Sequence, residues 1–142
     1  DTTKKEGAEV LMGGKRPSDF NKGYYYEPTV FDKVEDNFTI MKEEPFGPLV
    51  PMLAFKTFDE VIERANDNDL GLCSYLYTNS MDKANRGSEL LETGCVAVNT
   101  GAVAIAEAPF GGIKQTGYGR EGGSMAIKDY LNVKYTHMAL KV

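Results

Sequence analysis

The sequence has no tryptophan, a single histidine and only two cysteines among its 142 residues. Metal sites require several histidine or cysteine ligands close together. His137, Cys73 and Cys95 are far apart in the sequence and therefore do not predict one. Two cysteines are also too few for a disulfide scaffold, and they favour a reducing compartment such as the cytoplasm. We expect no metal centre, a cytoplasmic location and two cysteines that serve as core residues of strands.

Long apolar runs and an excess of positive charge are missing as well. The longest apolar segments, 95–98 and 102–106, are far shorter than the roughly 20 residues of a membrane-spanning helix. The formal net charge is −5, whereas a surface that binds nucleic acid needs a basic face. The sequence therefore argues against a nucleic-acid partner and against a membrane partner.

The sequence instead alternates short apolar runs with helix patterns. Thr57 and Glu60 form a capping box, and apolar residues follow at helical spacing from Phe58; Ser80 begins a second helix over 81–91. Strands are predicted at 8–13, 24–34, 49–56, 72–78 and 95–99. This alternation indicates an α/β fold with parallel strand pairing.

A glycine-rich loop over 100–123 contains Gly117, Gly119 and Gly122, which match the G-x-G-x-x-G spacing of a dinucleotide-binding turn. That turn needs a strand before it, and a helix and a second strand after it. No strand pattern precedes these glycines, and only 20 residues follow Gly122. We interpret the glycines as positions of positive φ and close backbone packing. A short helix over 124–131 and a terminal strand over 132–142 are predicted after the loop.

The segment EEPFGP, residues 43–48, must be a turn because Pro45, Gly47 and Pro48 disfavour both helix and strand. A carboxylate on a rigid turn can accept hydrogen bonds from two vicinal hydroxyls, and a neighbouring phenyl ring can pack on a flat ring. A ribose with a nicotinamide would suit this pair, as would many other ligands. A solvated acidic turn without a ligand is an equally good interpretation of these residues.

Several motifs in this order resemble the C-terminal part of the aldehyde dehydrogenase superfamily. They are EEPFGP at 43–48, PFGGIKQTGYGREGG at 109–123 and YLNVKY at 130–135. The match extends over essentially the whole chain and is most similar to the succinate-semialdehyde dehydrogenase branch.

The resemblance implies a fold, a function and partners. Residues 1–129 would be part of the catalytic domain, an open, mostly parallel sheet flanked by helices, and residues 130–142 would be a terminal oligomerisation strand. The function implied is NAD- or NADP-dependent oxidation of an aldehyde, such as succinic semialdehyde, to a carboxylic acid. The implied partners are the aldehyde substrate and further copies of the chain, as a dimer or tetramer.

The resemblance also implies roles for single residues. Glu44 would accept hydrogen bonds from the nicotinamide ribose, Phe46 would pack beside the nicotinamide, and Phe110 would line the aldehyde tunnel. Ala104 and Ile105 would belong to the same pocket wall, at positions where semialdehyde enzymes commonly carry Ser or Asn. Either arginines elsewhere bind the distal carboxylate, or the natural aldehyde is not succinic semialdehyde.

The family's nucleophilic cysteine and general-base glutamate belong to motifs that this sequence does not contain. The chain begins without Met, at residues that look like the end of a helix. We therefore expect a fragment that has no catalytic residue and is inactive alone. The alternative is a free-standing, non-catalytic interaction module that uses its terminal strand to bind a partner.

Overall fold

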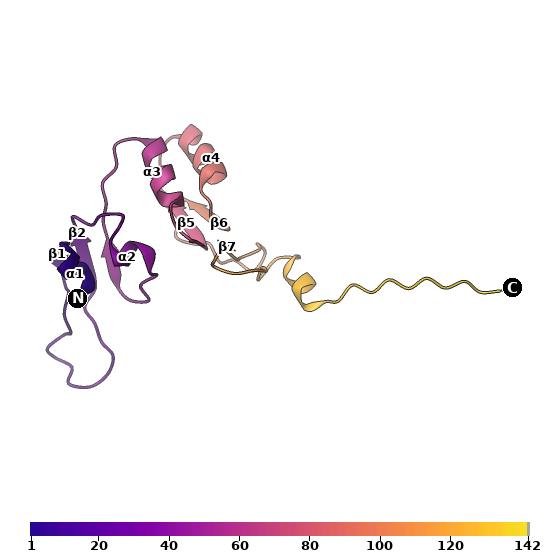
Figure 1. The fold of residues 1–142 in the computed structure, drawn as a ribbon, viewed down its shortest axis with the longest axis horizontal. Helices are drawn as coiled ribbons and strands as arrows, with labels where there is room; N and C mark the ends of the chain where they lie inside the picture. The colour runs from indigo at the N-terminus through magenta and orange to yellow at the C-terminus, as the bar shows by residue number, and fades with distance from the viewer. Residues whose placement is uncertain (142) are drawn as a thin grey trace. The chain divides into compact units, whose positions relative to one another are not determined.

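The computed structural model describes residues 1–141 and has the α/β character expected from the sequence (Figure 1). The chain divides into two compact units, one of residues 1–68 and one that begins at Asp69. Each unit contains its own strands and helices.

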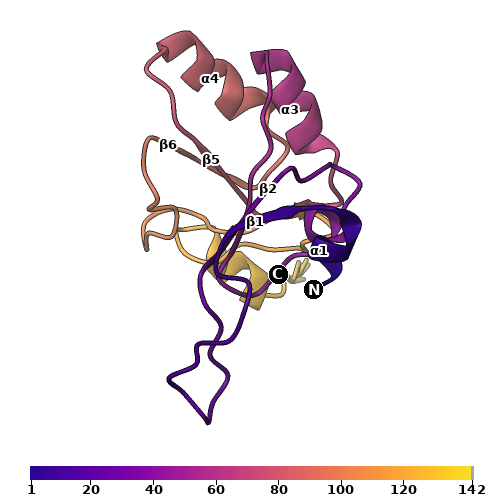
Figure 2. The ribbon, with the colours of Figure 1, turned by 90° about the vertical axis from the view of Figure 1, so that its left-hand side faces the viewer.

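The first unit is built on a three-stranded sheet of β1 (Glu9–Met12), β2 (Thr29–Asp32) and β3 (Leu49–Pro51). Strand β2 lies in the middle, antiparallel to β1 and parallel to β3. The loop between β1 and β2 projects beyond the sheet (Figure 2). All three strands were predicted, but β2 and β3 are shorter than expected. Pro28 stands directly before β2 and Pro51 ends β3, and a proline has no N–H to donate to a ladder.

The core of this unit lies under β2 and the segment that follows it. Its buried members are Phe31, Val34, Phe38 and Ile40. The helices α1 (Thr2–Glu6) and α2 (Thr39–Lys42) contact each other in the same unit. Thr29 is only 1 % exposed. Its hydroxyl donates to the Glu27 carbonyl and accepts from the Gly14 N–H, both at 2.8 Å, so this buried polar group is satisfied.

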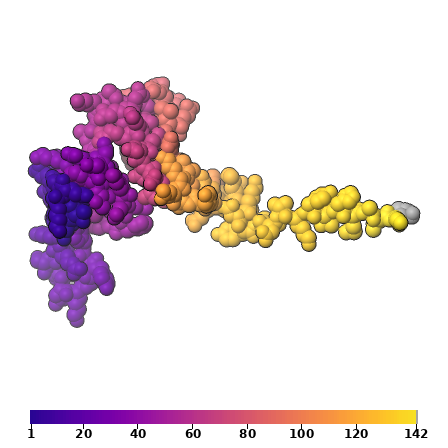
Figure 3. Space-filling view, viewed as in Figure 1, coloured from indigo at the N-terminus to yellow at the C-terminus, as the bar shows by residue number. Residues whose placement is uncertain are grey.

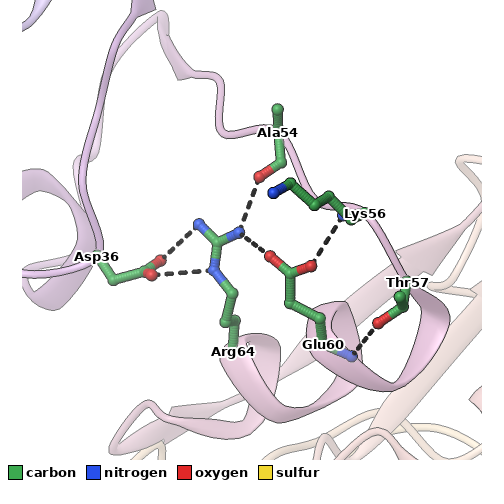
Figure 4. Close-up of polar contacts among 6 residues, drawn as sticks. All are labelled: Asp36, Ala54, Lys56, Thr57, Glu60 and Arg64. Atoms are coloured by element: carbon green, nitrogen blue, oxygen red, sulfur yellow. Dashed lines mark hydrogen bonds and ion pairs between the residues drawn. The ribbon is translucent and has the colours of Figure 1, made fainter.

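The predicted capping box begins helix α3 (Phe58–Asn66) (Figure 4). The Glu60 N–H donates to Thr57 Oγ1 at 3.2 Å, and the Glu60 carboxylate accepts from the Lys56 N–H at 2.8 Å. Arg64, one turn further along, donates to Asp36, to the Ala54 carbonyl and to Glu60. These contacts join α3 to the segments on either side of β3.

The second unit contains a parallel pair, β5 (Cys73–Leu76) and β6 (Cys95–Val98), connected by α4 (Met81–Leu90). Ser80 caps α4, since its hydroxyl accepts from the Lys83 N–H at 3.3 Å. A further antiparallel pair joins β4 (Leu70–Gly71) to β7 (Ile113–Lys114). The second helix that the sequence predicts is confirmed. The predicted parallel pairing is present for β2–β3 and β5–β6, whereas β1–β2 and β4–β7 pair antiparallel.

The resemblance implies part of an open, mostly parallel sheet, and residues 1–141 do not form one continuous sheet. Three separate sheets are present instead, with three, two and two strands. The alternation of apolar residues that predicts a strand is local. Joining strands into one sheet requires a continuous series of backbone partners, for which this sequence carries no signal.

The C-terminal end also differs from the prediction. A five-residue 3-10 helix, η1 (Ala126–Tyr130), replaces the expected helix over 124–131. No strand forms in the described part of 132–142; residue 142 lies outside it. Residues 131–141 form an extended segment without regular secondary structure (Figures 1 and 3), and Val133 is fully exposed. A strand requires a ladder partner, and this segment has none among residues 1–141. Across all of residues 1–141, no helix has both the length and the apolar composition of a membrane span.

Candidate functional site

The turn over 43–48 is held by backbone hydrogen bonds on both sides. The Gly47 N–H donates to the Pro45 carbonyl at 2.9 Å, and the Leu49 N–H donates to the Gly47 carbonyl at 2.8 Å. The Pro48 carbonyl accepts from the Thr29 N–H at 2.8 Å and so ties the turn to β2. The turn predicted from the sequence is confirmed, and its backbone is anchored to the central strand of the sheet.

Glu44 and Phe46 project from this turn into solvent. The Phe46 side chain is 95 % exposed, and Glu44 is also exposed. Within residues 1–141, neither side chain has a hydrogen bond, ion pair or ring contact. A carboxylate whose acceptor positions are vacant can bind two hydroxyl donors, and an open phenyl face can pack on a planar ring.

Helix α2, which leads into the turn, is fixed at both ends by distant side chains. The Glu6 carboxylate accepts from the Thr39 N–H at 3.1 and 3.2 Å and from the Thr39 hydroxyl at 2.6 Å. At the other end, Asn68 Nδ2 donates to the Met41 carbonyl at 3.1 Å. The N-cap residue of α2, Phe38, has no side chain that can cap, so Glu6 takes this role from 33 residues away.

The predicted pocket residues Ala104, Ile105 and Phe110 lie in the second unit, whereas Glu44 and Phe46 lie in the first. Ala104 and Ile105 are exposed, and Phe110 is half-buried. Phe110 exchanges two backbone hydrogen bonds with Glu121, each of 2.7 Å, which close the glycine-rich loop on itself.

Arg120 organises this loop, a role that the sequence did not reveal. Its Nη1 donates to the carbonyls of Gly112 and Gly119 at 2.9 and 2.8 Å, and its backbone N–H donates to Asp129 at 2.8 Å. An open hollow of about 610 Å³ lies beside it; residues lining it include Leu72, Phe110, Thr116, Tyr118, Arg120 and Tyr130. No residue pattern in the loop pairs Arg120 with these carbonyls, so the sequence carries no signal for this role.

The glycines of the G-x-G-x-x-G match have positive φ: 125° at Gly117, 88° at Gly119 and 68° at Gly122. A Cβ on Gly122 would lie 2.7 Å from the Ala108 carbonyl oxygen. These values confirm that the glycines serve backbone conformation and close packing. Within residues 1–141, no further strand follows to complete a dinucleotide-binding unit.

The two cysteines are half-buried and lie opposite each other on neighbouring strands, which the sequence did not indicate. Their expected role as core residues is correct only in part. Burial and the neighbouring Cys95 thiol raise the pKa of the Cys73 thiol. Neither cysteine is in a disulfide, and no cluster of three potential metal ligands occurs in the part of the chain that the structure describes.

Curated proteins similar to this chain are aldehyde dehydrogenases with different substrates. The chain is 44 % identical over 133 residues to a chloroplastic betaine aldehyde dehydrogenase of Atriplex hortensis, a match that covers 94 % of this chain and 26 % of that protein. It is 47 % identical over 131 residues to the mitochondrial succinate-semialdehyde dehydrogenase of Arabidopsis thaliana, which covers 92 % and 24 %. The expected similarity to succinate-semialdehyde dehydrogenases is confirmed. The chain spans about a quarter of the length of the curated relatives it matches. Because both relatives are named for organelles, they do not support the expected cytoplasmic location.

A solved structure gives the same assignment. The NAD+ complex of an aldehyde dehydrogenase from Bacillus cereus superimposes with a TM-score of 0.89 at 46 % identity, covering 94 % of this chain and 27 % of that one. The sequence model of the aldehyde dehydrogenase family matches residues 1–136. The chain therefore belongs to the aldehyde dehydrogenase family.

Proposed function

We propose that this chain is part of an NAD(P)-dependent aldehyde dehydrogenase that oxidises an aldehyde to a carboxylic acid. Family membership and the NAD+ complex of the Bacillus cereus relative support this proposal. The observation that carries it is the turn over 43–48, which presents a carboxylate and an open phenyl ring from an anchored backbone. Residues 1–129 would contribute to the catalytic domain.

In this proposal, Glu44 accepts hydrogen bonds from the two ribose hydroxyls next to the nicotinamide, and Phe46 packs beside the nicotinamide ring. The nicotinamide, when bound, accepts the hydride that the aldehyde loses on oxidation. The chain's own contribution is to orient the ribose and the ring, because the turn that carries both side chains is tied to β2. Either NAD or NADP fits this contact, which does not involve the 2′ position of the adenosine.

Ala104, Ile105 and Phe110 form an apolar part of the aldehyde pocket in this proposal. The similarity to succinate-semialdehyde dehydrogenases favours a semialdehyde as substrate. A substrate carboxylate next to Ala104 and Ile105 would find no hydrogen-bond donor in their side chains, and an unpaired buried charge is costly. For succinic semialdehyde, cationic groups outside this chain would have to bind the carboxylate.

Substitutions in the complete enzyme test the role of Glu44. Glu44→Ala removes the ribose acceptor and should raise the KM for the coenzyme about 10- to 100-fold, because a hydrogen bond to a charged group contributes about 1.5–3 kcal/mol. Glu44→Gln should give a smaller increase. The adjacent exposed carboxylate provides the matched control: Glu43→Ala should leave the KM within about twofold. Equal effects of the alanine substitutions at 43 and 44 would contradict the assignment.

The exposed segment 131–141 supports a role as a strand that pairs with another copy of the chain, and residues 130–142 form the oligomerisation strand of this proposal. Val133 and Tyr135 are 102 % and 84 % exposed, and an extended segment with exposed apolar side chains can gain its ladder bonds from a partner. Light scattering on the complete enzyme should give a smaller assembly after truncation behind Tyr130. An unchanged assembly would contradict this role.

The same exposed segment favours the second candidate, a non-catalytic interaction module. The two candidates differ in coenzyme-dependent chemistry. A complete protein that oxidises none of a panel of aldehydes with NAD or NADP, while its terminal segment still binds a partner, would favour the module.

A further inference from the structure

Cys73 and Cys95 occupy matching positions at the beginning of two parallel strands. Cys73 is the first residue of β5 and Cys95 the first of β6, and the two are direct partners in the register of the pair. In-register residues of neighbouring strands project to the same face of the sheet. The fold therefore places side by side two thiols that 21 residues separate in the sequence.

The spacing of a strand pair is compatible with a covalent link. Neighbouring strands lie about 4.8 Å apart, within the roughly 4.4–6.8 Å range of Cα separations found in disulfides. This spacing permits a bond between the two sulfur atoms without a large movement of the backbone.

Both thiols are free and half-buried, so a small reagent can reach them. Cys95 also has a contact to the glycine-rich loop, because its Sγ–H donates to the Gly111 carbonyl at 3.8 Å. Gly111 directly follows Phe110, whose backbone pairs with Glu121. Oxidation of Cys95 would remove this contact between β6 and the loop.

We propose that Cys73 and Cys95 are an oxidisable thiol pair that closes to an intramolecular disulfide by exchange with a low-molecular-weight disulfide. One protein thiolate attacks the reagent, forms a mixed disulfide and releases one reagent thiol. The second protein thiolate then attacks the protein sulfur of the mixed disulfide and releases the other reagent thiol. The protein loses two hydrogen atoms, which reduce the reagent disulfide to two thiols.

The disulfide would have two local effects. It would fix the starts of β5 and β6 to each other covalently, and it would remove the S–H donor from the Gly111 carbonyl. The loop segment around Phe110 would then lose one of its anchors. The proposal concerns residues that the proposed aldehyde chemistry does not use, so it does not depend on that function.

Incubation of the reduced complete enzyme with oxidised glutathione at about pH 8, followed by peptide mapping, tests the proposal. We expect loss of the free thiols of Cys73 and Cys95, one peptide that links these two residues, and a mass of this peptide lower by two hydrogen atoms than the sum of its two parts. A reductant should reverse all three changes. Because the raised pKa of Cys73 keeps its thiol protonated at neutral pH, the link should form faster as the pH increases.

Two serine variants identify the pair independently of this link. Cys73→Ser and Cys95→Ser should each stop at a mixed disulfide with glutathione, because the resolving thiol is missing. Circular dichroism of each variant, compared with the original chain, establishes that it is folded. Three results would overturn the proposal. In the first, Cys73 and Cys95 of the original chain each keep a mixed disulfide with glutathione. In the second, the disulfide joins two separate chains, and in the third the folded chain does not react whereas the urea-unfolded chain does.

Discussion

At the scale of single residues, the contacts of the Glu60 carboxylate depend on pH. Its carboxylate accepts from the Lys56 N–H and from Arg64, which in turn donates to both oxygens of Asp36 at 2.9 and 3.1 Å (Figure 4). The backbone hydrogen bond from Lys56 is the main cause that lowers the pKa of Glu60 below its ordinary value of 4.5. The ionised form is therefore the form that the folded state favours.

A carboxyl group whose pKa is lower in the folded state stabilises the protein at pH values above its ordinary pKa. This stabilisation is lost as the pH falls through the pKa of the folded state. We expect the urea midpoint of the original chain to exceed that of Glu60→Gln at about pH 7, and the difference to shrink as the pH falls below the ordinary pKa of 4.5. Because the site is exposed, 1 M salt should reduce the difference. A difference that grows on acidification would contradict the assignment.

Glycines in the loop over 100–123 allow a graded test of backbone strain. Gly101 has open space around it and no positive φ, Gly117 has a φ of 125° and open space, and Gly122 combines a φ of 68° with a close carbonyl. Substitution by alanine should lower the free energy of unfolding by less than about 0.5 kcal/mol at Gly101 and by about 1 kcal/mol at Gly117. At Gly122 the loss should be about 2–3 kcal/mol. Urea unfolding followed by circular dichroism measures this order, and equal losses at all three positions would rule out the conformational explanation.

At the scale of elements, α2 depends on a side chain from α1. A four-residue helix has almost no stability of its own, and Glu6 satisfies both the N–H and the hydroxyl of Thr39. Glu6→Ala should therefore lower the free energy of unfolding by about 1–2 kcal/mol.

Glu6→Gln retains an acceptor oxygen and should lose less than Glu6→Ala. Glu9→Ala is the matched control, since Glu9 pairs with Lys33 at an exposed position and should lose little. Hydrogen exchange of the Thr39 amide reports on the contact directly. Unchanged protection of this amide in Glu6→Ala would show that the carboxylate does not hold the helix.

At the scale of the whole molecule, the chain covers about a quarter of the length of its relatives. The resemblance assigns the nucleophilic cysteine and the general base to motifs that are not in these 142 residues. We expect that Cys73 does not replace the nucleophile, because its raised pKa disfavours the thiolate at neutral pH.

We therefore predict that the purified 142-residue chain forms no NADH from any aldehyde. Absorbance at the NADH band, followed with an aldehyde panel and both coenzymes, measures this. The complete enzyme under the same conditions is the positive control. Aldehyde-dependent NADH formation by the chain alone would disprove the prediction.

Local chemistry explains which elements could be predicted from the sequence. The start of α3 was marked by Thr57 with Glu60, and the start of α4 by Ser80. Such caps can be recognised in a sequence because the capping side chain accepts from an N–H only three residues further along. The prolines and glycine of 43–48 restrict their own backbone, so the turn with Glu44 and Phe46 was also predictable. Neither α2 nor the 3-10 form of η1 was predicted, because both are too short to show a periodic apolar pattern.

The sequence by itself determined the starts of α3 and α4, the turn at 43–48, the positive φ of Gly117, Gly119 and Gly122, and the family. These features depend on neighbouring residues and on motifs that are read in order along the chain. Only the tertiary structure decided that Cys73 faces Cys95, that Glu6 caps α2 and that Arg120 binds the carbonyls of its loop. The register of β5 against β6 and the approach of α1 to α2 depend on how separate segments pack, and no residue pattern within either segment specifies its partner.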